Sequence, residues 1–157
     1  MRTGIALGSN LGDRHAMIRF AVEQLRIIHG EGKFLLSSFH ESEPQDCPPD
    51  SPTFLNAVVE IETSHSPLQL LHHLKSLEQK AGRPSNHEFH GPRTLDLDIL
   101  YYGDKVILSK ELQLPHPRIT ERLFVLKPLS EILPHLSLPG WSMSCQEYLS
   151  NFNIKII

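Results

Sequence analysis

Hydrophobic and polar residues alternate along this chain with two different periods, and the order of those periods predicts a mixed fold of strands and helices. Period two is typical of strands, because successive side chains of a strand point to opposite faces. Strands are predicted over four segments: residues 3–7, 33–40, 54–63 and 95–101. Apolar residues spaced three and four apart predict two amphipathic helices, over about 14–29 and 67–81. The order β-α-β-β-α-β favours a ferredoxin-like α+β fold, an antiparallel sheet with both helices packed on one face.

The ends of the two helices carry recognisable capping signals. Asp13 is a suitable N-cap for the first helix, and Gly30 is a suitable stop. Ser66, which precedes a proline, and Gln69 form a capping-box pattern at the start of the second helix. Gly82 is expected to end that helix, so both helices have defined limits.

The remainder of the chain predicts a C-terminal extension that covers the second face of the sheet or leaves it as the site. A short hairpin is expected within 104–114, and a helical pattern follows over 119–126, where Pro128 is expected to stop it. Ser144 and Glu147 form a further capping-box pattern, which predicts a final short helix.

Length and composition place the chain among ordinary folded proteins. Its 157 residues favour one domain, 1–157, and its 39% hydrophobic and 21% charged residues argue against disorder. The net charge of −3 does not favour a nucleic-acid partner. No segment resembles a signal peptide or a membrane span, which points to the cytoplasm and away from a membrane. Two cysteines, Cys47 and Cys145, do not indicate a disulfide framework.

The last predicted strand of the sheet carries the strongest chemical signal. Asp96 and Asp98 alternate with apolar residues, so both carboxylates are expected on one face, roughly 6–7 Å apart. Hard carboxylate oxygens at this spacing suit Mg²⁺ held against phosphates. Such a pair also occurs where a strand simply turns a polar face to water. Aspartate is disfavoured in strands, the flanks are apolar and Arg93 stands just before, which favours a metal and phosphate site.

Four short motifs recur together in order along the chain. They are GSNLGD at 8–13, FLNA at 54–57, GPRTLDLDIL at 91–100 and PHPRITERLFVLKPL at 115–129, and a shorter fifth piece, GR at 82–83, stands between the second and the third. Together they resemble the 6-hydroxymethyl-7,8-dihydropterin pyrophosphokinase family of the folate pathway. The resemblance extends from about residue 5 to residue 134.

This resemblance implies transfer of diphosphate from ATP to the hydroxymethyl group of a reduced pterin, with Asp96 and Asp98 holding two Mg²⁺ ions. The implied catalytic residues are Arg83, Arg93, Asp96 and Asp98. The implied pterin-binding residues are Ser42, Pro44, Phe54, Asn56 and Phe124. The implied nucleotide-binding residues are Glu78, Arg83, Arg93, Ile99, His116 and Arg122. After Arg83, the loop carries Ser85, Phe89 and His90 where some members of the family have a second Arg and a Trp.

Other interpretations stay open at this point. Taken singly, Phe54 and Phe124 are more often core residues, and Arg83 is more often a cation at a helix C-terminus. A metal-dependent phosphohydrolase using the same two carboxylates is a second hypothesis, and a non-enzymatic ligand-binding module is a third. Two polar segments, about 43–53 and 83–92, are expected to close as lids over ATP. Docking with other folate-pathway enzymes is left open.

Overall fold

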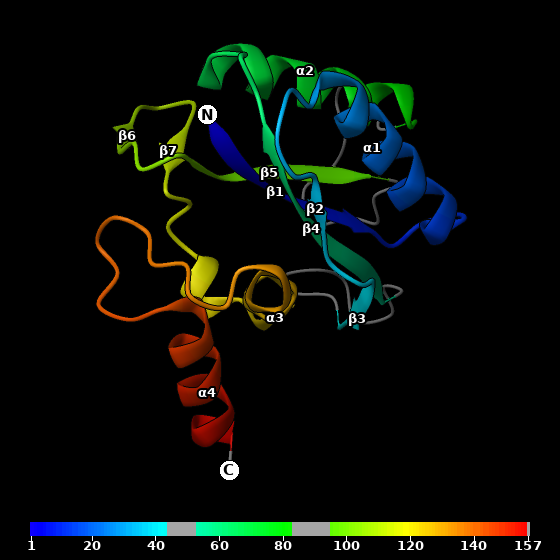
Figure 1. The fold of residues 1–157 in the computed structure, drawn as a ribbon. Coiled ribbons are helices and arrows are strands. Elements are labelled where there is room, and N and C mark those ends of the chain that lie inside the picture. The colour runs from blue at the N-terminus through cyan, green and yellow to red at the C-terminus, as the bar shows by residue number, and fades with distance from the viewer. Residues whose placement is uncertain (44–52, 83–94, 157) are drawn as a thin grey trace.

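The computed structural model describes residues 1–43, 53–82 and 95–156 (Figure 1). Three residues predicted to belong to the site, Pro44, Arg83 and Arg93, lie outside the described residues, as do most of the two predicted lids. None of the helices in the described ranges is long and apolar enough to cross a bilayer.

The centre of the molecule is an antiparallel sheet whose strand order agrees with the ferredoxin-like prediction. Its strands are β1 (Arg2–Ser9), β2 (Leu35–Leu36), β3 (His40–Ser42), β4 (Phe54–Glu62) and β5 (Asp96–Tyr102). The order across the sheet is β2-β4-β1-β5, and β3 pairs with β4 beside β2. The strand β1 therefore lies between β4 and β5 and is paired antiparallel to both.

Two helices cover one face of this sheet, α1 (Arg14–Ile28) and α2 (Pro67–Lys80) (Figure 1). Their caps agree with the sequence prediction: the Asp13 side chain accepts a hydrogen bond from the Ala16 amide, and Ser66 and Gln69 form the capping box. Apolar side chains of both helices and of the three long strands form the larger core. Its fully buried members include Ile5, Ile18, Leu25, Ile61, Leu70, Leu74, Leu77 and Leu95.

The C-terminal extension covers the opposite face. The hairpin β6 (Ile107–Leu108) and β7 (Gln113–Leu114) precedes the 3-10 turn η1 (Ile119–Glu121) and the helices α3 (Leu123–Ile132) and α4 (Cys145–Ile156). Figure 1 shows α3 on the side of the sheet opposite α1 and α2. A second, smaller core joins α3 to the sheet. Its buried members are Val58, Leu100, Tyr101, Ile119, Val125, Leu126, Leu129, Leu138 and Cys145.

The strand predicted over 33–40 is wrong as a single element, because the chain forms two short strands, β2 and β3, with a break between them. The register against β4 shifts by one residue across the break: Leu36 pairs with Val59, whereas His40 pairs with Asn56. At the break, the Ser37 hydroxyl accepts the Val58 amide at 2.9 Å. A side chain therefore replaces a backbone partner in the ladder, which hydrophobic periodicity does not reveal.

The prediction that Pro128 stops the helix is also wrong, because α3 continues through Pro128 to Ile132. An internal proline removes one helical hydrogen bond and costs about 3 kcal/mol. Val125, Leu126 and Leu129 are buried on the sheet, and burying each large aliphatic side chain contributes about 1.5–3 kcal/mol. The free energy gained by burying these side chains of α3 therefore exceeds the cost of the proline within the helix.

Candidate active site

The paired carboxylates lie on the face of the sheet opposite α1 and α2. In the register, Gly8 of β1 pairs with Asn56 on one side and with Asp96 on the other, and Ala6 pairs with Asp98. Directly paired residues of antiparallel strands share a face, so the Asn56 amide and both carboxylates project from the same face. Two strand spacings separate Asn56 from Asp96, which is about 10 Å.

Gly8, the central residue of this row, has no side chain above the sheet, whereas the Tyr101 ring fills the space above Gly4 on the same face of β1. Gly4, Ala6 and Gly8 occupy the positions of β1 that face the carboxylate side. A Cβ added at Gly8 would lie 3.4 Å from Asn56 Oδ1 and 3.5 Å from Phe54 Cδ1, so both side chains lie directly beside Gly8. Gly8 was not among the site residues predicted from the sequence, because strand register, and not a local pattern, places it between Asn56 and Asp96.

Three residues predicted to bind the pterin meet at the paired ends of β3 and β4. Ser42 pairs with Phe54 in the register. The Asn56 side chain is only 5% exposed. Its Nδ2 donates to Ser42 Oγ at 2.6 Å and to the His40 carbonyl at 3.3 Å. These contacts hold the amide nitrogen toward β3, so the amide oxygen lies on the Gly8 side.

The two aromatic residues come from different layers but border the same face. Phe54 begins β4 on the Asn56 side of the strand, because Leu55 and Ala57 belong to the core under the helices. Phe124 is in the first turn of α3 and packs against the second core. The guanidinium carbon of Arg122 lies 5.7 Å from the centroid of the Phe124 ring. The structure therefore places one flat ring on the sheet and the other on the helix that covers it.

The two carboxylates of β5 are half-buried, and the predicted alternation is observed from Leu95 to Ile99. Beyond Ile99 the register shifts, and Tyr101 packs in the second core instead of sharing a face with Leu97. Leu97 and Ile99 are buried in the core under α1 and α2, which leaves Asp96 and Asp98 on the other face. Asp96 and Asp98 each take part in an interaction within the chain. Half-buried oxygen donors at i and i+2 on an edge strand are a suitable donor set for Mg²⁺ bound to a polyphosphate.

Two of the residues predicted to bind nucleotide have other environments. Ile99 is 3% exposed, and its side chain lies in the core under the helices, on the face opposite Asp96 and Asp98. Glu78 of α2 is buried, and its Oε2 accepts the Leu97 amide at 2.8 Å. Leu97 stands between the two aspartates in the sequence, so this bond ties their strand, β5, to α2. The contact gives Glu78 a structural role.

His116 is hydrogen-bonded to β5, and the charge of Arg122 acts on its ring. The His116 amide donates to the Leu100 carbonyl at 2.7 Å, and its Nδ1 accepts the Arg118 amide at 3.2 Å. An accepting Nδ1 places the proton of the neutral ring on Nε2. Arg122 Nε is buried and has no hydrogen-bond partner among the described residues. An imidazole N–H and a guanidinium in this position suit phosphate oxygens.

The acid stability of the protein should depend on His116. Burial, and then the charges of Arg122 and Arg118, lower the pKa of His116 from its ordinary value of 6.5. Because the unfolded chain then binds the proton more tightly, stability should rise with pH up to about 6.5 and level off above it. Urea unfolding near pH 5 and near pH 7.5 should show a smaller acid loss for His116→Gln than for the wild type. An equal loss in both proteins would contradict this assignment.

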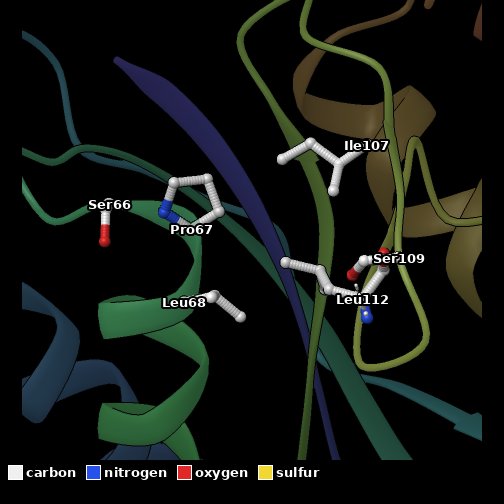
Figure 2. Close-up of a pocket in the computed structure, with 6 residues that line it drawn as sticks. All are labelled: Ser66, Pro67, Leu68, Ile107, Ser109 and Leu112. Carbon is white, nitrogen blue, oxygen red and sulfur yellow. Dashed lines mark hydrogen bonds between the residues drawn. The ribbon is translucent and has the colours of Figure 1, made fainter.

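A separate pocket lies at the other end of the sheet. It has a volume of about 300 Å³ between the start of α2 and the segment of β6 and β7 (Figure 2). It is lined by Ser66, Pro67, Leu68, Ile107, Ser109 and Leu112. These residues follow the ends of β4 and β5, whereas Asn56 and Asp96 lie at the beginnings of those strands. The pocket is therefore distinct from the row of Asn56, Gly8 and Asp96.

Solved structures share this fold. The wild-type HPPK-DHPS of Plasmodium falciparum with pteroate superposes with a TM-score of 0.76, covering 99% of this chain and 43% of that chain at 14% identity. The chain is thus an α+β protein with the fold found in those structures, and the fold class predicted from the sequence is confirmed.

Sequence comparison identifies the family. The model of the 7,8-dihydro-6-hydroxymethylpterin-pyrophosphokinase family matches residues 4–134, and the chain belongs to this family. A pyrophosphokinase of Bacillus subtilis, named for 2-amino-4-hydroxy-6-hydroxymethyldihydropteridine, is 44% identical over 82% of this chain and 75% of its own length. The enzyme of the same name from Haemophilus influenzae is 42% identical over 87% of this chain and 84% of its own. These matches confirm the resemblance drawn from the motifs.

Other relatives are much longer than this chain. The folic acid synthesis protein fol1 of Pneumocystis carinii is 44% identical over 92% of this chain but only 19% of its own length. The chain thus spans about a fifth of the fungal relatives that it matches.

Proposed function

We propose that this chain transfers diphosphate from ATP to the hydroxymethyl group of 6-hydroxymethyl-7,8-dihydropterin, giving AMP and the pterin diphosphate for folate biosynthesis. The observation that carries the proposal is the row of Asn56, Gly8 and Asp96 across three adjacent strands. An amide and a carboxylate about 10 Å apart on one face suit a flat heterocycle whose hydroxymethyl group reaches toward a polyphosphate. We regard 1–157 as one domain acting in the cytoplasm.

The pterin would bind over Gly8. Phe54 and Phe124 offer ring faces for stacking, and Asn56 Oδ1 can accept hydrogen bonds from the amino edge of the heterocycle. Because Ser42 and the His40 carbonyl already hold the Asn56 nitrogen, the amide is fixed before the ligand arrives. Binding therefore costs little ordering of this side chain.

The polyphosphate would bind at β5, with Asp96 and Asp98 holding Mg²⁺. The metal, when bound, neutralises charge on the phosphates and makes the β-phosphorus more open to attack. The chain itself would supply hydrogen-bond donors to the phosphate oxygens, namely the Nε2–H of His116 and the guanidinium of Arg122. Arg83 and Arg93 are proposed as further cations for the phosphates. Catalysis then depends mainly on alignment of the pterin hydroxyl and on preorganised charge.

Incubation with ATP, Mg²⁺ and 6-hydroxymethyl-7,8-dihydropterin should release AMP in proportion to the pterin consumed. AMP or phosphate formed at the same rate without pterin would favour the phosphohydrolase. Binding of pterin with no turnover would favour the ligand-binding module. Omission of Mg²⁺, with addition of a chelator, should stop AMP release.

Partners beyond the two substrates are also a proposal. Some relatives carry this domain within longer chains, and the solved HPPK-DHPS structures are examples. Association with another enzyme of folate synthesis would place successive active sites near one another.

A further inference from the structure

A hydrogen-bonded cluster joins the strand beside Asn56 to the helix that carries Phe124. His40 Nε2 lies 2.9 Å from Glu131 Oε1, and Ser38 Oγ donates to the same oxygen at 2.9 Å. The Ser38 amide lies 3.1 Å from both Glu131 oxygens. The Glu131 side chain is 40% exposed. Slight desolvation opposes its ionisation, but the hydrogen bonds from His40 and Ser38 outweigh this and lower the pKa of the carboxyl.

Each end of this cluster continues into a wall of the proposed pterin site. On the sheet side, His40 pairs with Asn56 in the register, and its carbonyl accepts the Asn56 amide. On the helix side, Glu131 stands seven residues after Phe124 within α3. Seven residues are two turns, so the two side chains lie on the same side of the helix about 10 Å apart along its axis.

The cluster therefore connects the two walls by a short path of direct contacts. The apolar residues of α3 hold the helix on the sheet, but apolar packing is not directional. Hydrogen bonds to a carboxylate have defined lengths and angles. The bond from His40 to Glu131 can thus set the slide and rotation of α3, and with them the place of the Phe124 ring relative to Asn56.

Resting on the proposed function, we propose that His40 is a positioning residue for the pterin, fixing through Glu131 the helix that carries Phe124 over the strand that carries Asn56. His40 touches neither substrate in this arrangement. Its loss should weaken pterin binding more than nucleotide binding, because Asp96 and Asp98 of β5 lie three strands away from β3, with β4 and β1 between them. Arg122 directly precedes α3, so it is the proposed phosphate donor that a shift of this helix would also reach.

The test is a double-mutant cycle of His40→Ala, Glu131→Ala and the combined variant. Each single change should raise the KM for the pterin about three- to tenfold, with a smaller rise in the KM for ATP, and the double variant should be no worse than the worse single one. His40→Gln, which keeps a donor N–H, should restore most of the pterin affinity. Glu23→Ala, which breaks the exposed pair of Glu23 and Arg26 on α1, is the matched control.

Calorimetric titration with 6-hydroxymethylpterin, in the presence of a non-hydrolysable ATP analogue, separates this inference from the proposed function. An active wild type with unchanged pterin affinity in His40→Ala overturns the positioning role alone. A wild type that binds pterin without releasing AMP overturns the proposed reaction, and the titration still decides the role of His40. Additive effects in the cycle, or failure of His40→Gln to restore affinity, would mean that His40 contributes only general stability. A wild type that does not bind pterin overturns both.

Discussion

Replacing Asp98 by Asn should lower kcat for AMP release at least about a thousandfold and change the free energy of unfolding by less than about 1 kcal/mol. Asn keeps the size and one acceptor oxygen but removes the negative charge that a metal ligand needs. Metal stabilisation of a phosphoryl transition state is worth several kcal/mol, and each 1.4 kcal/mol corresponds to a factor of ten. Asp96→Asn should act in the same direction.

Asp104→Asn is the matched control for this experiment, because Asp104 is exposed in the turn directly after β5. It removes the same charge near the same strand and should leave turnover unchanged. Titration with Mg²⁺ should show whether Asp98→Asn recovers activity at high metal concentration, as a weakened ligand set would. Turnover within tenfold of the wild type would exclude a metal role for Asp98. Urea unfolding of each variant separates chemistry from stability.

Replacing Gly8 by Ala should raise the KM for the pterin about 10- to 200-fold while the protein stays folded. The added Cβ would meet Asn56 Oδ1 and Phe54 at 3.4–3.5 Å, which is ordinary contact distance, so the fold can accommodate it. It would occupy the space in which the heterocycle is proposed to lie. A single methylene in a fitted pocket is worth about 1–3 kcal/mol of discrimination.

Gly30→Ala provides the comparison for this change. A Cβ at Gly30 would also make one contact at 3.4 Å, to the Glu62 carbonyl, far from the carboxylate row. This variant should keep both KM values. Steady-state kinetics with each substrate varied in turn should show the loss in Gly8→Ala for the pterin only. An unchanged pterin KM would mean that the ligand does not lie over Gly8.

Local chemistry was sufficient to predict most elements of the fold. Caps at Asp13 and Ser66 and the period-two alternation in β4 and β5 depend on neighbouring residues only, and each agrees with the structure. The predicted strand over 33–40 and the predicted helix end at Pro128 were wrong, because contacts with residues distant in the sequence determine the structure there. The Ser37 hydroxyl enters the ladder of another strand, and the packing of α3 carries the helix through Pro128.

Residue order along the chain was therefore enough to establish the element sequence, the shared face of Asp96 and Asp98, and the likeness to the pterin pyrophosphokinase family. It could not place Gly8 between Asn56 and Asp96, put Tyr101 in the second core, or bring His40 to Glu131. Those three facts depend on the register of the strands and on the position of α3 on the sheet. Both are set by contacts between residues dozens of positions apart in the sequence. The pairing of strands far apart in the sequence is determined by the free energy of the whole core. A local sequence pattern therefore cannot predict it.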